Sequence, residues 1–418
     1  MNILTIIIIQ IYLHIHFIYS SFPSSEYLSI PVKFIDFSTA ILMYTSSNKL
    51  YFNLDLTNNI SLITNAYYFE HPSPLSYTLH SETITTYNNH SIHYKCNFMK
   101  DKFFFRENYL SLDIYPYLFF YTPLSHVPPH HLQTSLSLCH YYHNTNHSLI
   151  YQYYKKGLIQ HKVFGIWFNM NKQYDINTYL YIGGVPKILT SSNNYIKHSI
   201  NVAHYEQKWK FKVKDVGISV SNGNSNSNNN IVYYNSINDV FGFISLSNDD
   251  IQVDDAFFEW INVNVFEKYY YTNNTCKLND KPKQIKAIEC KVSYIQYFPT
   301  MYIQIQHNIF ELNKHNLFNY YTDTCLFIIK PYKDTTYNYF NNEWIFGYKW
   351  LLQLHDTFIE FNYDTDIISI YINKANILQP ALTKYITHTY YKLITTLYTF
   401  ITLIQLINVF IIIIYKYI

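Results

Sequence analysis

The sequence predicts an all-β body with few short helices, lying between an apolar segment at each end of the chain. The chain has 418 residues, enough to bury one large core or two lobes of ordinary size. Short apolar runs rich in β-branched and aromatic side chains are separated by Asn, Ser and Pro, which is typical of strands and turns. The clearest expected strands are 40–45, 50–56, 103–112, 163–168, 179–182, 210–220, 301–306 and 357–363.

Helical spacing of apolar residues is confined to two stretches, 149–154 and 254–266. Residues 221–230 are a Ser/Asn tract with one Gly, which predicts a surface loop. The net charge is +2 and no long basic or acidic run occurs, so we expect no nucleic-acid partner. The chain contains 46 tyrosines, so a Tyr at any single position carries little weight.

The N-terminal residues predict a signal peptide. Residues 3–19 are a short apolar run that ends before Ser20 and Ser21, and this predicts a signal peptide over 1–20. The run has no basic residue before it and contains His14 and His16, so an uncleaved anchor is the alternative.

The C-terminal residues predict a membrane span. The segment 393–415, from Leu393 to Tyr415, has no charged side chain, and as a helix it would be about 34 Å long, enough for a bilayer core of about 30 Å. Lys392 and Lys416 flank it. A glycolipid-anchor signal is the rival, but no small-residue site precedes the span. We therefore expect a type I single-pass protein in the secretory pathway or at the cell surface.

The five cysteines have no C-x-x-C spacing, so we expect no zinc site built on cysteine pairs. Disulfides are the default in an oxidising compartment, and an odd count leaves at least one thiol unpaired or bonded to another chain. The sequence leaves the partners of Cys96, Cys139 and Cys276 open. Acceptor sequences for N-glycosylation begin at Asn59, Asn89, Asn146 and Asn273.

The most specific pattern lies near the C-terminus, in the runs WIFGYKWLL from Trp344 and FNYDTDIISI from Phe361. They resemble the last conserved block of pepsin-like aspartic proteases. Further runs resemble other blocks of that family in the same order, although not one Gly occurs before Gly157. These runs are SLI from Ser148, KGLI from Lys156 with VFGI from Val163, TYLYIGGVP from Thr178, WKFKVKDVGI from Trp209, and FPTMYI from Phe298 between Cys290 and Cys325.

The resemblance covers roughly residues 145–375 and implies the two-lobed pepsin-like aspartic protease fold. It implies lobes at 21–200 and 201–378, with a stalk at 379–392 before the span. It also implies a disulfide between Cys290 and Cys325 in the second lobe, and a flap over the substrate that carries Tyr94.

The family's chemistry requires two Asp side chains that share one proton, each on a D-T/S-G loop. The first loop aligns at Asp55, where Leu56 and Thr57 replace the hydroxyl residue and the glycine. The alternative for Asp55 is a surface or turn residue beside Asn58 and Asn59, without a catalytic role. The second loop aligns at Asp239, or at Asn238 if it is placed one residue earlier, in which case no carboxylate pair exists. The two altered loops predict weakened or absent hydrolysis.

The sequence gives no metal or cofactor site. His126 and His130 are four residues apart, as are His143 and His147, but Pro and Asn residues in these segments argue against a helix that would align them. We expect neither a metal nor a cofactor.

By resemblance, the chain is a membrane-anchored pepsin-like aspartic endopeptidase, weakened or inactive, that takes a peptide in the cleft between its lobes. The alternative is a non-catalytic pepsin-fold protein, at the surface or in the lumen, that binds peptide or a partner. A third hypothesis is an unrelated adhesive ectodomain.

Overall fold

In the computed structural model, most of the chain between residues 27 and 374 is described, and these residues form a mostly β structure with few short helices. The predicted signal peptide, stalk and span lie outside this part, as do the four glycosylation acceptors. The described residues are 27–35, 38–44, 49–57, 61–64, 77–86, 92–105, 117–123, 134–140, 148–170, 176–203, 209–220, 230–234, 240–248, 250–271, 275–280, 285–312, 314, 317–332, 343–353 and 356–374.

None of the helices in these ranges has the length and apolar character that a membrane crossing requires.

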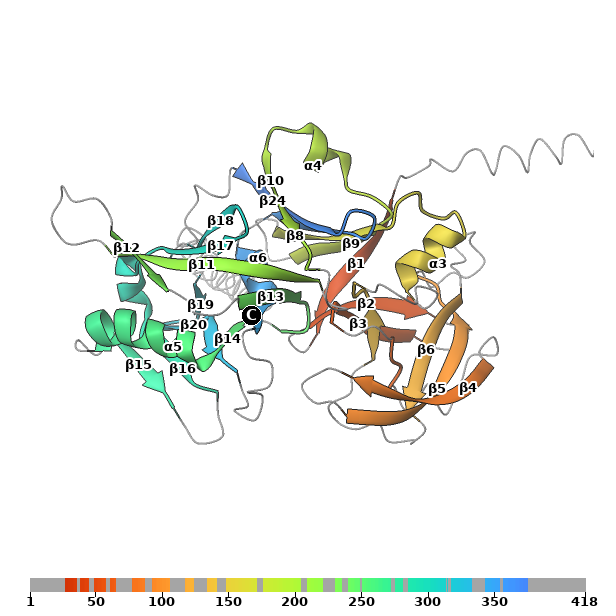
Figure 1. The fold of residues 1–418 in the computed structure, drawn as a ribbon, viewed down its shortest axis with the longest axis horizontal. Coiled ribbons are helices and arrows are strands. Elements are labelled where there is room, and N and C mark those ends of the chain that lie inside the picture. The colour runs from red at the N-terminus through yellow and green to blue at the C-terminus, as the bar shows by residue number, and fades with distance from the viewer. Residues whose placement is uncertain are drawn as a thin grey trace, which may run out of the picture.

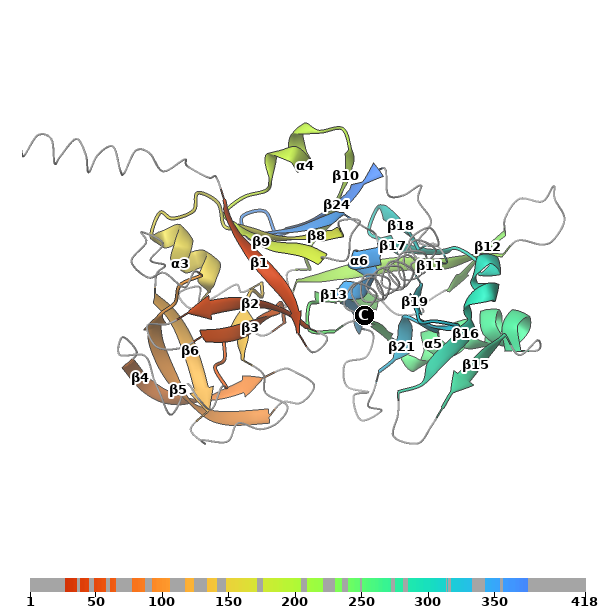
Figure 2. The ribbon, with the colours of Figure 1, turned by 180° about the vertical axis from the view of Figure 1, so that it is seen from behind.

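Two β-rich bodies lie side by side, and one shared sheet lies above both and continues into the body that contains β2, β3 and β7 (Figure 1). Strands β2 to β7 belong to one body, and most of the elements from β11 to β22 belong to the other. The view from behind shows the same division, with β8, β9, β10 and β24 above both (Figure 2). The last strands of the described chain therefore return to pair with strands from its first half.

The shared sheet has nine strands, and neighbouring strands run antiparallel except where β3 pairs with β7. The strand Thr357–Asn362 within it is buried at every residue except Asn362. In spatial order the strands are β10 (Tyr195–Asn201), β24 (Ile367–Asn373), β23 (Thr357–Asn362), β8 (Val163–Met170), β9 (Ile176–Ile182), β1 (Leu28–Ile35), β2 (Ser38–Tyr44), β3 (Lys49–Asp55) and β7 (Ser135–Ser137).

The second large sheet has eight strands and contains two parallel pairs, β13 with β22 and β14 with β21. Strand β12 pairs with β11 outside the main order. The strands are β18 (Asn308–Leu312), β17 (Met301–Ile305), β11 (Lys210–Val220), β13 (Val240–Ser245), β22 (Glu343–Gly347), β14 (Ile251–Val253), β21 (Ile329–Pro331) and β12 (Asn230–Tyr234).

Two smaller antiparallel sheets complete the β structure. The first lies in the body that contains β11 to β22, and the second in the body that contains β2 to β7 (Figure 1). The four-stranded sheet contains β15 (Cys276–Asn279), β16 (Ala287–Lys291), β20 (Thr324–Phe327) and β19 (Phe318–Tyr320), and the three-stranded sheet contains β4 (Tyr77–Thr86), β5 (Ile92–Lys102) and β6 (Tyr117–Pro123).

Short helices occur between the strands, including both predicted stretches. The stretch 254–266 begins as an α-helix capped by Asp254, whose side chain accepts a hydrogen bond from Phe257 N. It continues after Ile261 as a π-helix, in which the Tyr271 hydroxyl donates to Asn262 Oδ1 at 2.6 Å. The helices are α3 (Leu149–Lys155), α4 (Lys187–Ser191), α5 (Asp255–Ile261), the π-helix η2 (Asn262–Tyr271), the 3₁₀-helix η3 (Val292–Tyr297) and α6 (Tyr348–Gln353).

The expected disulfide between Cys290 and Cys325 is wrong in the structure. Cys290 is bonded to Cys276 instead, and Cys325 carries a buried thiol. Cys290 lies on the middle strand of three and is opposite Cys276 on β15 and Cys325 on β20. Both neighbours therefore lie within reach of Cys290, and the spacing along the chain does not decide which one bonds to it.

Candidate functional site

Asp55 is the last residue of β3, between an antiparallel and a parallel neighbour. Strand β2 pairs with β3 on one side, and on the other β7 places Ser137 opposite Asp55. The backbone continues this contact, because Leu138 N donates to Asp55 O at 2.7 Å. Only 6 % of Asp55 is exposed, so it is a buried residue at the end of a strand and not a surface residue.

The loop after Asp55 closes on its carboxylate. Oδ1 of Asp55 accepts hydrogen bonds from Thr57 N at 2.8 Å and from Thr57 Oγ1 at 2.6 Å. This is the turn in which an Asp side chain bonds to the backbone two residues later. Leu56 and Thr57 are not among the described residues with positive φ, so this turn does not require the glycine of the family loop.

Strand β13 repeats the same arrangement in the other body and ends at Ser245. It pairs antiparallel with β11 and parallel with β22, and its last residue is opposite Gly347, as Asp55 is opposite Ser137. After each loop the chain runs antiparallel to the strand that pairs in parallel with β3 or β13. In the first body this contact is the bridge between Leu62 and Ser135 of β7, and in the second body it is the pairing of β14 with β22.

The residues that follow also match. Asp55-Leu-Thr-Asn in the first body corresponds to Ser245-Leu-Ser-Asn in the second. Strand pairing and local sequence therefore agree that Ser245 occupies the position that Asp55 occupies in the other body.

Ser245 supplies a hydroxyl group where the first loop supplies a carboxylate. Its Oγ lies 3.2 Å from Ser247 Oγ and accepts a hydrogen bond from Asn248 Nδ2 at 3.0 Å. Only 2 % of Ser245 is exposed. The hydroxyl is thus buried and bonded within its own loop.

The two loops are connected between the bodies through Thr39 of β2. The backbone N of Thr39 donates to Leu246 O at 3.0 Å, and its Oγ1 donates to the same oxygen at 3.2 Å. Because β2 is the antiparallel neighbour of β3, this contact brings the Ser245 loop against the strands that carry Asp55.

The expected partners of Asp55, Asp239 and Asn238, lie outside the described residues. The next described residue, Val240, begins β13, and the loop that corresponds to Asp55 follows the other end of that strand. Five residue steps of a strand cover about 17 Å. The sequence analysis missed Ser245 because it searched for a carboxylate, whereas the repeated pattern of Leu, a hydroxyl residue and Asn could have located it.

The predicted flap residue Tyr94 lies in β5, opposite Ile84 of β4. It is two residues from Ile92, whose pairing with Thr86 is the last of the ladder. Tyr94 is thus near one end of a two-stranded ladder, and its side chain lies outside what the structure describes.

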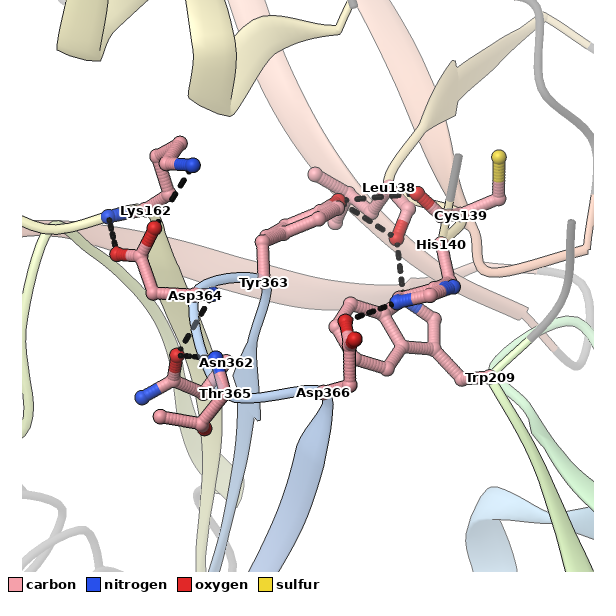
Figure 3. Close-up of polar contacts among 10 residues, drawn as sticks. All are labelled: Leu138, Cys139, His140, Lys162, Trp209, Asn362, Tyr363, Asp364, Thr365 and Asp366. Carbon is pink, nitrogen blue, oxygen red and sulfur yellow. Dashed lines mark hydrogen bonds and ion pairs between the residues drawn. The ribbon is translucent and has the colours of Figure 1, made fainter. Parts of the chain in front are cut away.

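The segment after β7 is anchored by side chains from distant parts of the chain (Figure 3). Leu138 O accepts hydrogen bonds from Trp209 Nε1 at 2.8 Å and from the Tyr363 hydroxyl at 3.2 Å. The same hydroxyl lies 3.1 Å from Cys139 O, and His140 Nε2 lies 2.7 Å from Asp366 Oδ1. Burial raises the pKa of Tyr363 well above its ordinary value, so its hydroxyl keeps the proton that it donates.

Cys139 is the nucleophilic side chain beside Asp55, but it is not activated. Burial raises the pKa of its thiol to about 12; the hydrogen bond from Ser137 opposes this shift, and the charge of Asp55 adds to it. A thiol with so high a pKa is almost entirely protonated near neutral pH and reacts slowly.

No group of three or more His, Cys, Asp or Glu side chains in the described ranges is arranged to hold a metal ion. The paired histidines at 126, 130, 143 and 147 lie outside those ranges.

No family model and no curated protein matches the sequence. Among solved structures, the chain is similar to the crystal structure of aspartic proteinase from Irpex lacteus, with a TM-score of 0.57. The match covers 85 % of this chain and 99 % of that chain, with 9 % sequence identity. Likeness at this identity concerns the fold alone, and at that level the expected pepsin-like architecture is confirmed.

Proposed function

We propose that this chain is a non-catalytic protein with a pepsin-like fold, which binds an extended peptide or protein segment between its two bodies. One observation carries the proposal, namely that the position corresponding to Asp55 in the second body is Ser245.

Aspartic hydrolysis requires two carboxyl groups in different protonation states. The ionised group activates a water molecule, and the protonated group donates to the peptide carbonyl. A serine hydroxyl does not ionise in the acid range where such a pair works, so Ser245 is unable to share a proton with Asp55 as a second carboxyl would. The general acid–base contribution, typically 10²–10⁴-fold in rate, is therefore absent.

The polar groups of both loops have hydrogen-bond partners within the protein. Thr57 donates to Asp55, Asn248 donates to Ser245, and Thr39 connects the second loop to the first body. Buried polar groups that are satisfied in this way stabilise one arrangement of the site. This supports a role in which the junction of the two bodies is a fixed binding surface.

Location is also part of the proposal. The apolar run within 1–20 would direct the chain into the secretory pathway, and 393–415 would anchor it as a type I single-pass protein. The described body would then face the lumen or the exterior, where peptide and protein ligands are encountered. The cysteine pair Cys276–Cys290 is consistent with an oxidising compartment.

A weakened aspartic endopeptidase that uses Asp55 with Asp239 is the second candidate. It is favoured by the state of Asp55, which is buried and held by two donors from Thr57, as a catalytic carboxylate would be. This candidate requires Asp239 to reach Asp55 from the opposite end of β13.

The test is peptidase activity of the full-length chain, purified in mild detergent, on an unfolded protein substrate from acid to neutral pH. We expect no cleavage above the level of an Asp55→Asn variant. Asp255→Asn makes the same chemical change at an exposed helix position and serves as the matched control. Cleavage that survives in the control but is abolished by Asp55→Asn and by a transition-state mimic would overturn the proposal.

Peptide binding, the second part of the proposal, is tested with the same protein, which is immobilised and exposed to a mixture of unstructured peptides. We expect a subset of peptides to be retained and to elute with free peptide of the same sequence. If no peptide is retained above the level of a denatured sample, peptide binding is wrong.

A further inference from the structure

Three cysteines lie in one row across three neighbouring strands of the four-stranded sheet. Cys276 of β15 is opposite Cys290 of β16, and Cys290 is opposite Cys325 of β20. Directly opposite residues of antiparallel strands project from the same face with Cβ atoms about 4.5–5.5 Å apart. All three side chains are buried.

The central cysteine has a bonded neighbour on one side and a thiol on the other. Cys276 and Cys290 form the disulfide, and Cys325 Sγ donates to the backbone oxygen of Cys290 at 3.3 Å. The Cα atoms of Cys276 and Cys290 are 4.0 Å apart. For Cys325, which is opposite Cys290 on the other side, the usual separation of such pairs is about 4.5–5.5 Å, within the Cα range that a disulfide spans.

We propose that Cys290 has two alternative disulfide partners, Cys276 and Cys325, and that the two forms interconvert by thiol–disulfide exchange within the protein. The Cys325 thiolate attacks Sγ of Cys290 and forms the new sulfur–sulfur bond. The bond to Cys276 breaks, and its electron pair leaves on the sulfur of Cys276, which takes up the proton that Cys325 lost. No electrons enter or leave the protein, so the step needs no oxidant or reductant.

The order of the three strands favours this reaction over other pairings. The attacking, central and leaving cysteines lie on consecutive strands, so the entering and leaving sulfurs are on opposite sides of Cys290. Cys276 and Cys325 are two strands apart, about 9–10 Å, which exceeds the Cα separation of about 7 Å that a disulfide tolerates. Cys290 is thus shared, and its two neighbours do not bond to each other directly.

The exchange is slow in the folded state. Burial raises the pKa of the Cys325 thiol to about 12; the hydrogen bond to Cys290 O opposes this shift, and the charge of Glu289 adds to it. The reactive thiolate is therefore rare, and each form persists long enough to be isolated.

The two forms attach different segments to β16. The disulfide in the structure holds β15, which follows the π-helix η2 and its contact between Thr275 Oγ1 and Tyr270 O at 2.7 Å. The alternative disulfide holds β20 and leaves β15 attached by backbone pairing and by the contacts of Lys277 and Asn279 with Glu289. The exchange thus changes how firmly the helical segment 255–271 is attached to the sheet.

The test uses the full-length chain, unfolded in denaturant so that buried thiols become accessible, and maps disulfides by mass spectrometry after unpaired thiols are alkylated with iodoacetamide. We expect the Cys276→Ser variant to form the Cys290–Cys325 disulfide and the Cys325→Ser variant to keep Cys276–Cys290. The matched control is Cys290→Ser, which should leave Cys276 and Cys325 both alkylated. A folded Cys276→Ser protein with Cys290 and Cys325 both alkylated would overturn the proposal.

The unaltered protein provides a second test that does not depend on a variant folding. It is incubated with a catalytic amount of reduced glutathione and sampled over time. We expect a Cys290–Cys325 fraction that grows to a constant value. If Cys276–Cys290 is the only disulfide of the three at every time, the exchange is wrong.

Discussion

The loops after β3 and β13 have the same strand neighbours but differ in how their parallel partners are held. Beside Asp55, the chain after β7 is fixed by side chains from far along the sequence, those of Trp209 and Tyr363. Beside Ser245, the chain after β22 is fixed by backbone groups of the segment that follows β13, because Gly347 N donates to Asp250 O at 3.1 Å and Tyr348 N to Asn248 O at 3.0 Å.

The two loops show that the backbone frame of the site, meaning its strand pairing and apolar packing, is independent of the polar group that it carries. Both loops keep the strand pairing, the buried leucine and the hydroxyl residue directly after it, yet only one has a carboxylate at the end of its strand. The frame depends on backbone pairing and apolar packing, which tolerate the exchange of one polar end residue. The chemistry depends on that residue alone.

The largest loss of stability is expected at Trp209, whose side chain anchors the chain after β7. Trp209→Ala removes a fully buried ring and the hydrogen bond to Leu138, and should lower the free energy of unfolding by about 4 kcal/mol. Urea unfolding followed by circular dichroism measures the loss.

The control compares Trp→Phe at two sites. Trp209→Phe loses a satisfied hydrogen bond, whereas Trp350, which follows β22, has a buried Nε1 with no hydrogen-bond partner among the described residues. Trp209→Phe should therefore cost about 1 kcal/mol more than Trp350→Phe. Equal costs would mean that the bond to Leu138 does not distinguish the two bodies.

The next effect tests whether the two loops face each other. Ser245→Asp adds a carboxyl group to a buried position and should cost about 3 kcal/mol at pH 7. Burial and the charge of Asp55 would raise the folded-state pKa of the new group above its unfolded value of about 4. The stability is then kept below that value and lost as the pH rises through the folded-state pKa, so the cost should be smaller at pH 4 than at pH 7.

A double variant separates the two causes. Adding Asp55→Asn to Ser245→Asp removes the neighbouring charge and leaves the burial unchanged, so part of the pH dependence should disappear. Unfolding is measured at both pH values for the single and double variants. An unchanged pH dependence would show that the two side chains do not interact.

The smallest effect compares the two end residues themselves. Asp55→Ala removes a carboxylate that accepts two hydrogen bonds from Thr57, and should cost about 2 kcal/mol. Ser245→Ala removes a neutral hydroxyl that accepts one from Asn248, and should cost about 1 kcal/mol. Thermal unfolding of both variants at pH 7 gives the comparison, and a larger cost at Ser245 would contradict it.

Much of the local structure could be predicted from the sequence. The expected strand 210–220 coincides with β11, and 163–168 lies within β8, because alternation and β-branched content are local properties. The expected strand 50–56 overlaps β3, which ends at Asp55, for the same reason. The helix at 254–266 was predicted as one segment, whereas its second half is a π-helix, a distinction that apolar spacing does not make.

The sequence by itself determined the β-rich body and the strand that contains Asp55, since these follow from residue type and local period, and the resemblance of its blocks to a known family implied the pepsin-like fold. Only the tertiary structure decided that Ser245 corresponds to Asp55 and that Cys290 bonds to Cys276. Both depend on which strands become neighbours: β13 pairs with β22 across about a hundred residues, and β16 lies between two cysteine-bearing strands. Pairing over such distances is set by the packing of the whole chain. The repeated Leu, hydroxyl residue and Asn marks Ser245 in the sequence, but the strand pairing establishes that it corresponds to Asp55.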